Sequence, residues 1–389
     1  MKKFRLAIVI SHPIQYYAPL FKLLTETEIL LKVFYTLGES NLVDKGFGTT
    51  INWDIPLLEG YEYEFIENIA KEKGSHHFKG IQNRDLIDKL TEFLPDAVLV
   101  YGWAYSSHLK VMRHFHKKVP VWFRGDSTLL DKQSTFKTIL RKLFLTWLYS
   151  FVDKALYVGQ KNRAYFEFSG LKEDQLVFVP HTVDNERYAS LRKEEALVLR
   201  QKLNIKDEET LILFAGKFES KKDPEHLLHS FIELNRSNVH LLFVGNGELE
   251  KSLKSKVMSS KLKNIHFMDF QNQTQMPVVY QACDLFCLPS QGPGETWGLA
   301  VNEAMAAKKA ILVSDKAGCA ADLVKNQING YIFEVGNQKS LTTILNVLTE
   351  DKKRLILMGN RSGEIIKEWT FQKQVEKIIK ETKIAKQRK

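Results

Sequence analysis

Short, continuous apolar runs alternate with longer amphipathic stretches along most of this chain. A run that is apolar at every position is typical of a strand buried on both faces, as in a parallel sheet. The stretches between the runs repeat apolar residues every three or four positions, which indicates helices with one buried face. This alternation predicts an α/β fold with parallel sheets. In the first half the predicted strands cover residues 6–10, 32–36, 96–102, 120–125, 155–159 and 175–180.

The second half repeats the same alternation without repeating the sequence. Its predicted strands cover residues 210–216, 239–245, 264–270, 284–290, 310–314 and 330–335. A chain of 389 residues exceeds what one hydrophobic core usually serves, so two domains are expected. We place them at residues 1–190 and 191–370, with the charged helix 192–203 as connector and a basic helix in 371–389 that crosses back to the first domain. Residues 37–80 show no clear periodicity, and a connection of this length is uncommon unless it is functional or contains small elements.

Composition narrows the class of protein. The apolar fraction of 44% and the aromatic fraction of 11% are ample for packed cores. The net charge of +10 favours anionic partners such as phosphates, nucleotides or acidic lipid, although an ordinary basic enzyme fits it too. Three cysteines do not make a disulfide framework. The apolar start is short and ends at His12-Pro13, so it indicates a first strand rather than a signal peptide, and no apolar span is long enough to cross a membrane.

The most informative stretch is a strand, a glycine loop, a helix and a strand between residues 284 and 314. The loop carries Gly292, Pro293 and Gly294, and a helix is predicted from about Trp297 to Ala307. Such a junction directs free backbone N–H groups and the positive end of a helix at one point, which suits phosphate. Glu295 and Glu303 flank that point. Because carboxylates repel phosphate, they are better suited to accept hydrogen bonds from sugar hydroxyls, although two solvated glutamates on a surface helix would look the same in isolation.

The spacing of these residues adds a family resemblance. Glu295 and Glu303 form Glu-x7-Glu, followed by Ala304-Met305-Ala306 and a strand that ends in Ser314-Asp315. This block resembles the signature of the retaining glycosyltransferases of family four, which have the GT-B fold of two Rossmann-like, doubly wound domains facing across a cleft. The resemblance implies transfer of a hexose from a UDP- or GDP-sugar to a hydroxyl of a glycan or lipid-linked acceptor, with donor on the second domain and acceptor on the first. The resemblance also implies that this transfer belongs to cell-surface polysaccharide or glycolipid biosynthesis.

The resemblance also implies roles for individual residues on the donor side. Glu295 would bind the donor sugar, Glu303 the ribose diol, and Lys217 and Lys222, after the strand 210–216, the diphosphate. Ammonium groups there would stabilise the negative charge that grows on the departing nucleoside diphosphate. The catalytic set is therefore Glu295, Lys217 and Lys222. Further donor-binding residues are expected in the glycine loop and after the strand 264–270, namely Glu303, Gly294, Thr296, Trp297, Gly298, Phe270 and Gln271.

The acceptor side is expected at the ends of strands in the first domain, because ligands of doubly wound sheets bind at the carboxyl edge. The candidates are His12, Gln15, Tyr16, Arg124 and Asp126. A packed turn explains the first three equally well. Family members have a glycine pair where Ser11, His12 and Pro13 stand, and a histidine near residues 124–127, where this chain has none. Asp126 or Arg124 would then take over that role.

No Asp-x-Asp sequence occurs, so no metal site and no cofactor beyond the nucleotide-sugar co-substrate is expected. The stretch 134–159 combines Lys137, Arg141 and Lys142 with aromatic and aliphatic residues. This helix is either a core helix with a basic outer face or a helix that lies on an anionic membrane. The expected location is the cytoplasm, with peripheral contact at the inner face of the membrane. Two alternatives remain: a nucleotide-sugar epimerase of the GT-B fold, and a basic nucleic-acid-binding protein, for which no motif is present.

Overall fold

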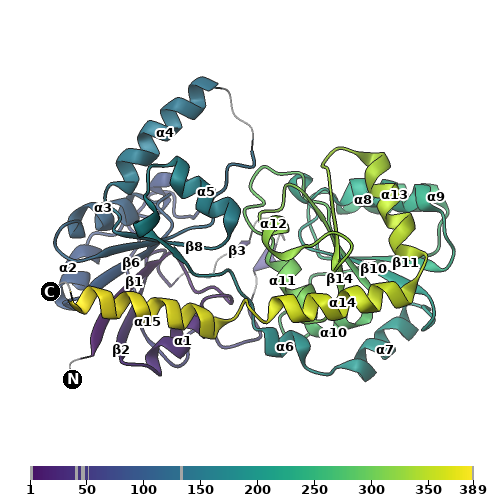
Figure 1. Cartoon of the computed structure of the whole chain (residues 1–389), viewed down its shortest axis with the longest axis horizontal. Helices are drawn as coiled ribbons and strands as arrows, with labels where there is room; N and C mark the ends of the chain where they lie inside the picture. Colours follow the sequence, from purple (N-terminus) through teal and green to yellow (C-terminus); the bar gives the residue numbers. More distant parts are fainter. Residues whose placement is uncertain (1–2, 40–42, 45–48, 51, 132–134, 388–389) are drawn as a thin grey trace. The chain divides into compact units, whose positions relative to one another are not determined.

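The chain forms two compact units, drawn in Figure 1. The computed structural model describes residues 3–39, 43–44, 49–50, 52–131 and 135–387. Unit 1 comprises Met1–Asn41, Pro56–Pro180 and Phe371–Lys389, and unit 2 comprises Leu42–Ile55 and His181–Thr370. The chain therefore changes unit at Pro180, before the predicted boundary at residue 190, and a short segment of the first half belongs to unit 2.

Unit 1 is built on a parallel seven-stranded sheet in the order β5-β2-β1-β6-β7-β8-β9. The strands are β1 (Phe4–Ile10), β2 (Ile29–Tyr35), β5 (Glu62–Phe65), β6 (Ala97–Tyr101), β7 (Val121–Arg124), β8 (Lys154–Tyr157) and β9 (Leu176–Phe178). The helices are α1 (Ala18–Thr25), α2 (Leu86–Glu92), α3 (Ser106–Phe115), α4 (Thr135–Tyr149), α5 (Gln160–Phe168) and α15 (Phe371–Gln387). Two short 3-10 turns cover Phe78–Gly80 and Glu173–Gln175.

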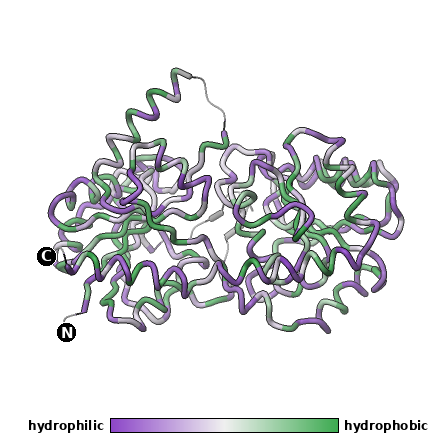
Figure 2. Tube along the Cα trace, in the orientation of Figure 1, coloured by the Kyte–Doolittle hydropathy of each residue, from purple (hydrophilic) through white to green (hydrophobic). Residues whose placement is uncertain are grey.

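The apolar runs form these strands because both faces of the sheet are covered. Alternate residues of β1 belong to two separate core clusters, with Leu6 and Ile8 in one and Ala7 and Val9 in the other. Figure 2 shows the hydrophobic residues concentrated in the strands. Helix α15 completes the first cluster and packs against α1.

Unit 2 contains a parallel six-stranded sheet in the order β12-β11-β10-β13-β14-β15. The strands are β10 (Thr210–Ala215), β11 (Val239–Val244), β12 (Ile265–Met268), β13 (Leu285–Leu288), β14 (Ala310–Ser314) and β15 (Gly330–Phe333). The helices are α6 (Asn185–Ala189), α7 (Lys193–Lys202), α8 (Pro224–Leu234), α9 (Glu250–Ser260), α10 (Met276–Ala282), α11 (Leu299–Ala306), α12 (Ala320–Leu323), α13 (Gln338–Thr349) and α14 (Lys352–Ile366), with a 3-10 turn at Ser220–Lys222.

Two Rossmann-like units of this order constitute the GT-B fold, and the predicted fold class is confirmed. The unparsed residues 37–80 contain β5, a small hairpin of β3 (Val43–Asp44) and β4 (Thr49–Thr50), and a 3-10 turn. Helix α6 was not predicted. Helix α11 begins at Leu299, later than the predicted start at Trp297, because Gly298 has φ +99°, a left-handed conformation that cannot continue a helix.

Candidate functional site

Two loops meet where the sheet of unit 2 reverses its order. The chain leaves β10 toward β11 on one side, whereas β13 leads to β14 on the other. Ligands of doubly wound sheets bind at the carboxyl ends of strands at such a point. The loops after β10 and β13 are joined directly, because Gln291 donates from its backbone N to Lys221 O (2.9 Å) and from Nε2 to Ser220 O (2.8 Å).

Lys222 and Glu295, which lie in these two loops, are in contact. The Lys222 ammonium pairs with Oε2 of Glu295, and Ser290 Oγ donates to the same oxygen at 2.8 Å. Glu295 is only 8% exposed. The structure therefore brings together a cation and a carboxylate that were both predicted for the site. They form a nearly buried ion pair at the point where an anionic ligand is expected.

The glycine loop between β13 and α11 is hydrogen-bonded to the segment after β14 on one side and exposed at Gly294 on the other. Gly318, after β14, donates its N–H to Glu295 O (3.1 Å), and Cys319 donates to Trp297 O (3.0 Å). A Cβ on Gly318 would lie 1.8 Å from Thr296 O, so only glycine permits this approach. Gly294 has φ +87°, and no atom lies within 4 Å of where its Cβ would be. The backbone that carries Glu295 is thus fixed, while the exposed turn leaves room beside it.

Glu303 lies on α11 and is 4% exposed. The hydroxyls of Tyr188 (α6) and Tyr280 (α10) each lie 2.8 Å from a different carboxylate oxygen and donate to it. The Tyr188 hydroxyl is also 3.2 Å from Gln273 Oε1, which accepts from Arg187 Nη1 at 3.1 Å. Each carboxylate oxygen can accept more than one hydrogen bond, so this arrangement fixes Glu303 in place and leaves acceptor capacity. Its ribose-binding role stays a prediction.

Trp297 points into the interior. Its indole is 3% exposed, Nε1 donates to Asn302 Oδ1 at 2.8 Å, and its ring centroid lies 5.3 Å from that of Trp369 and 5.8 Å from that of His181. The side chain supports the glycine loop from the interior. Thr296, by contrast, is half-buried beside Glu295.

The other donor-side candidates lie at the same edge of the sheet. Lys217 is half-buried in the loop after β10. Phe270 and Gln271 are half-buried in the loop after β12, where the Phe270 N–H donates to Asn246 Oδ1 at 2.8 Å. All of these loops follow the carboxyl ends of neighbouring parallel strands, so one ligand can contact several of them.

The acceptor candidates lie in unit 1. His12, Gln15 and Tyr16 are half-buried in the loop after β1, and His12 Nδ1 is 2.9 Å from Ser11 Oγ. Asp126 is half-buried after β7. These residues occupy the carboxyl edge of their sheet, where the sequence placed them.

Arg124 has a different environment from the other acceptor candidates. It is 1% exposed, and its guanidinium donates to Val179 O (2.9 Å) and Pro180 O (3.2 Å) at the end of unit 1. It lies over the ring of the neighbouring Tyr17, whose pKa burial raises to about 12. The Arg124 charge is therefore used to hold the chain where it leaves β9.

In the part of the chain that the structure describes, no three His, Cys, Asp or Glu side chains cluster closely enough to hold a metal ion. The three cysteines are buried and unpaired, and burial raises the pKa of the Cys283 thiol to about 12. A thiolate nucleophile is therefore disfavoured.

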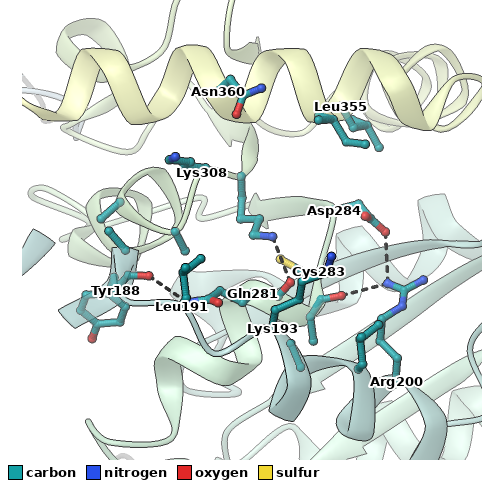
Figure 3. A pocket seen from close by; sticks show the side chains of 18 of the residues that line it. Tyr188, Leu191, Lys193, Arg200, Gln281, Cys283, Asp284, Lys308, Leu355 and Asn360 are labelled. Carbon is teal, nitrogen blue, oxygen red and sulfur yellow. Dashed lines mark hydrogen bonds and ion pairs between the residues drawn. The ribbon is translucent and has the colours of Figure 1, made fainter. Parts of the chain in front are cut away.

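A separate cavity of about 590 Å³ opens at the other edge of the same sheet (Figure 3). Its lining includes Gln281 and Asp284, which precede β13, and Lys309, which precedes β14. Arg200 contacts Asp284 at 3.3 Å, and Lys309 Nζ donates to Gln281 O at 3.0 Å. Because these residues precede the strands, the cavity is distinct from the site at their carboxyl ends.

Sequence reasoning missed three residues of the site. Ser290 follows β13 directly, and its position in the Pro-Ser-x-Gly turn was a usable signal. Tyr280 lies on α10, and nothing in the sequence of that helix marks its contact with Glu303. Tyr188 gave no signal, because its short helix α6 was itself not predicted and its contact with Glu303 spans 115 residues.

The two units together have the fold class of GT-B glycosyltransferases. Residues 197–365 match the family model described as glycosyl transferases group 1. The match agrees with the resemblance to family four.

Two curated relatives align with somewhat more than half of this chain. The lipopolysaccharide 1,2-N-acetylglucosaminetransferase of Salmonella typhimurium is 31% identical over 212 residues, which are 52% of this chain and 54% of that protein. The N,N'-diacetylbacillosaminyl-diphospho-undecaprenol alpha-1,3-N-acetylgalactosaminyltransferase of Campylobacter jejuni is 26% identical over 241 residues, 59% and 61% of the two chains. The chain thus spans little more than half the length of these curated relatives.

Solved structures show the fold over nearly the whole chain. Anabaena HepE in complex with UDP and glucose has a TM-score of 0.71 and 17% identity, with 97% of this chain and 98% of the other covered. Sucrose-phosphate synthase from Thermosynechococcus elongatus has a TM-score of 0.75 and 14% identity, with 98% and 100% covered. At such identities the likeness shows the fold alone.

Proposed function

We propose that this protein is a retaining glycosyltransferase that moves a hexose from a UDP- or GDP-sugar to a hydroxyl of a glycan or lipid-linked acceptor. The observation that carries the proposal is the contact of Lys222 with Glu295 beside the glycine loop and the α11 N-terminus. A cation, free N–H groups and a carboxylate in one place match a diphosphate joined to a sugar. The Salmonella and Campylobacter relatives are named for a lipopolysaccharide and a diphospho-undecaprenol acceptor, and this supports a glycan or lipid-linked acceptor here.

In this proposal the ion pair between Lys222 and Glu295 opens when the donor binds, and each partner contacts the donor instead. Lys222 turns from Glu295 to the diphosphate, and Lys217 assists from the same loop. The oxygens of Glu295 then accept hydrogen bonds from the donor sugar hydroxyls. As the bond between the anomeric carbon and the phosphate oxygen breaks, both electrons go to the diphosphate, and the two ammonium groups and the α11 N-terminus stabilise that growing charge.

Retention follows if the acceptor hydroxyl attacks from the face that the phosphate leaves. The acceptor oxygen then bonds to the anomeric carbon while its proton passes to the departing phosphate oxygen. No protein nucleophile is required. Glu303, held by Tyr188 and Tyr280, would bind the ribose diol equally before and during the reaction, so it contributes affinity rather than rate.

The test is a panel of nucleotide sugars. Thermal shift and calorimetry with UDP, GDP and a short oligonucleotide establish the ligand class, and the anomeric proton coupling of the product establishes the stereochemistry. We expect the protein to bind one of the two nucleoside diphosphates. We also expect the glycosidic bond of the product to have the same anomeric configuration, axial or equatorial, as the bond to phosphate in the donor. A donor epimerised without an acceptor would identify an epimerase, and tight binding of the oligonucleotide alone would refute the proposal.

We also propose that the protein contacts an anionic membrane through α4. Six large apolar side chains on this helix are exposed by between 41% and 70%, namely Phe136, Ile139, Leu140, Leu143, Phe144 and Trp147. Their spacing places them on one face, opposite the buried Leu145, Leu148 and Tyr149. Helix α4 projects from unit 1 in Figure 1. A helix whose inner face packs on the core has no structural need for a second apolar face, so a partner is expected.

The charge of α4 supports anionic lipid as the proposed partner. Lys137, Arg141 and Lys142 flank the exposed apolar face, and the helix contains no Asp or Glu. This combination is typical of helices that lie in the interface of an acidic membrane. Among the described residues, no helix is long and apolar enough to span a bilayer.

Vesicle flotation tests this contact. Wild-type protein should float with vesicles that contain acidic phospholipid, and Leu143→Glu should abolish flotation. The matched control is Leu94→Glu, which changes a leucine of unit 1 that is 70% exposed away from α4. If Leu143→Glu changes the oligomeric state in solution but not flotation, a second copy of the chain covers this face and the lipid proposal is wrong.

A further inference from the structure

A short segment of the first half is anchored in unit 2 at the carboxyl edge of the sheet. Asn52 O accepts from Asn272 Nδ2 at 2.7 Å. The Asp54 carboxylate accepts from Thr274 N at 3.1 Å and from the Thr274 hydroxyl. Residues 52–55, here named the Trp53 arm, are therefore fastened on both sides of Trp53 to the turn that precedes α10.

Between these anchors, Trp53 meets Phe270 edge to face. The ring centroids are 6.2 Å apart and the rings are inclined by 72°. Both side chains are half-buried. Two aromatic rings at right angles, each with part of its surface open, form a corner that can receive a flat ring.

This corner lies where the far end of a bound nucleotide would reach. Strand β12, which precedes Phe270, is separated from β10 by β11 alone, so the corner lies about 10 Å from the Lys222 loop along the edge. A ribose and a diphosphate can bridge this distance. Tyr188 also links Glu303 to this region, because its hydroxyl contacts both Glu303 and Gln273, and Gln273 lies in the turn that the arm caps.

We propose that Trp53 and Phe270 form the wall against which the base of the donor nucleotide packs, with Trp53 as a binding residue that the first half of the chain contributes. Asp54 is a positioning residue that holds the arm. This inference rests on the proposed nucleotide-sugar site and adds to it a residue from the other half of the chain. Stacking on an aromatic ring strengthens binding of a base, and removal of one ring costs about tenfold in affinity or more.

The experiment is calorimetric titration of UDP, GDP, ADP and inorganic pyrophosphate. The variants are Trp53→Ala, Trp53→Phe and Asp54→Ala, with Trp147→Ala on α4 as the matched control. Trp53→Ala should weaken each nucleoside diphosphate that the wild type binds by about tenfold, while pyrophosphate affinity stays within twofold. Trp53→Phe should retain most of the affinity. Asp54→Ala should weaken the same nucleoside diphosphates and leave pyrophosphate affinity within twofold.

The outcomes separate this inference from the function on which it rests. If wild-type protein binds no nucleoside diphosphate, both fail. If it binds one and Trp53→Ala binds it equally well, the inference fails and the proposed function stands. If Trp53→Ala weakens pyrophosphate as much as the nucleotide, or Trp147→Ala has the same effect, the arm has only a structural role and the inference is overturned.

Discussion

Removing both charges of the Lys222–Glu295 pair should restore much of the stability that Lys222→Met loses but none of its turnover. A double-mutant cycle can separate these two effects. The variants are Lys222→Met, which keeps the apolar stem, Glu295→Gln, and the two combined. The side chain of Glu295 is 7% exposed and that of Lys222 is 20% exposed. Removing the lysine leaves a nearly buried carboxylate that still accepts a hydrogen bond from the Ser290 hydroxyl, whereas removing the carboxylate leaves a cation that reaches water.

The magnitudes follow from that asymmetry. Removing one partner of a fully buried pair costs 3–5 kcal/mol, and with partial exposure and Ser290 retained we expect about 2–3 kcal/mol for Lys222→Met. Glu295→Gln keeps a hydrogen-bond acceptor for Ser290 and should cost about 1 kcal/mol. The double variant should resemble Glu295→Gln, because neither charge remains. Turnover should fall about a hundredfold to a thousandfold in Lys222→Met and should not recover in the double variant.

Hydrogen exchange of the β10 and β13 amides measures the opening free energy of unit 2 separately from unit 1. Initial rates with the full donor give turnover. Equal destabilisation by the two single variants, or a double variant that is less stable than Lys222→Met, would show that the charges are not coupled as described. A loss of turnover below about threefold in Lys222→Met would exclude its contact with the diphosphate.

Three further predictions concern donor binding, metal and pH. Glu303→Gln should weaken the affinity for the free nucleoside diphosphate, whereas Glu295→Gln should chiefly lower turnover with the complete donor; calorimetry beside initial rates decides, and equal loss of nucleotide affinity would contradict the division of roles. Turnover should survive excess EDTA because lysines stabilise the diphosphate, and a full loss that Mn²⁺ or Mg²⁺ restores would contradict this. Burial in unit 1 lowers the pKa of His108 to about 4, so the unfolded chain binds a proton near pH 6 that the folded one does not. Unit 1 should therefore be less stable at pH 5.5 than at pH 7.5 by about 1 kcal/mol by hydrogen exchange, and His108→Gln should remove that pH dependence.

Local pattern predicted the strands well, since β14 has the predicted bounds 310–314 and β10 and β11 begin at the predicted residues 210 and 239. These assignments depend on periodicity within one short segment. Periodicity carries no information on which distant side chains meet. The ion pair of Lys222 with Glu295 and the contact of Tyr188 with Glu303 were therefore not foreseen, although three of these residues were singled out. Trp297 was assigned to the donor, because a loop sequence does not show which side chains turn inward.

The contacts of the Trp53 arm with unit 2 were not predicted for the same reason. Residues 52–55 lie in sequence between β2 and β5 of unit 1 and were grouped with the first domain for that reason. Their anchors, Asn272 and Thr274, are both 220 residues away. No alternation of apolar and polar residues marks so short a segment, so its contacts could be found only in three dimensions.

The return of α15 to unit 1 affects the order in which the chain can fold during synthesis. Phe371, Ile378 and Ala385 fill a core cluster whose other members are nearly all in place once residue 179 has been made. A nascent chain of that length would expose this apolar surface beside α1 while His181–Thr370 of unit 2 is still being translated. N-terminal domains usually fold first on the ribosome, but here the first unit to emerge is the last to be completed. A fragment ending at residue 180 should accordingly require a chaperone or aggregate, and adding α15 as a separate peptide should rescue it.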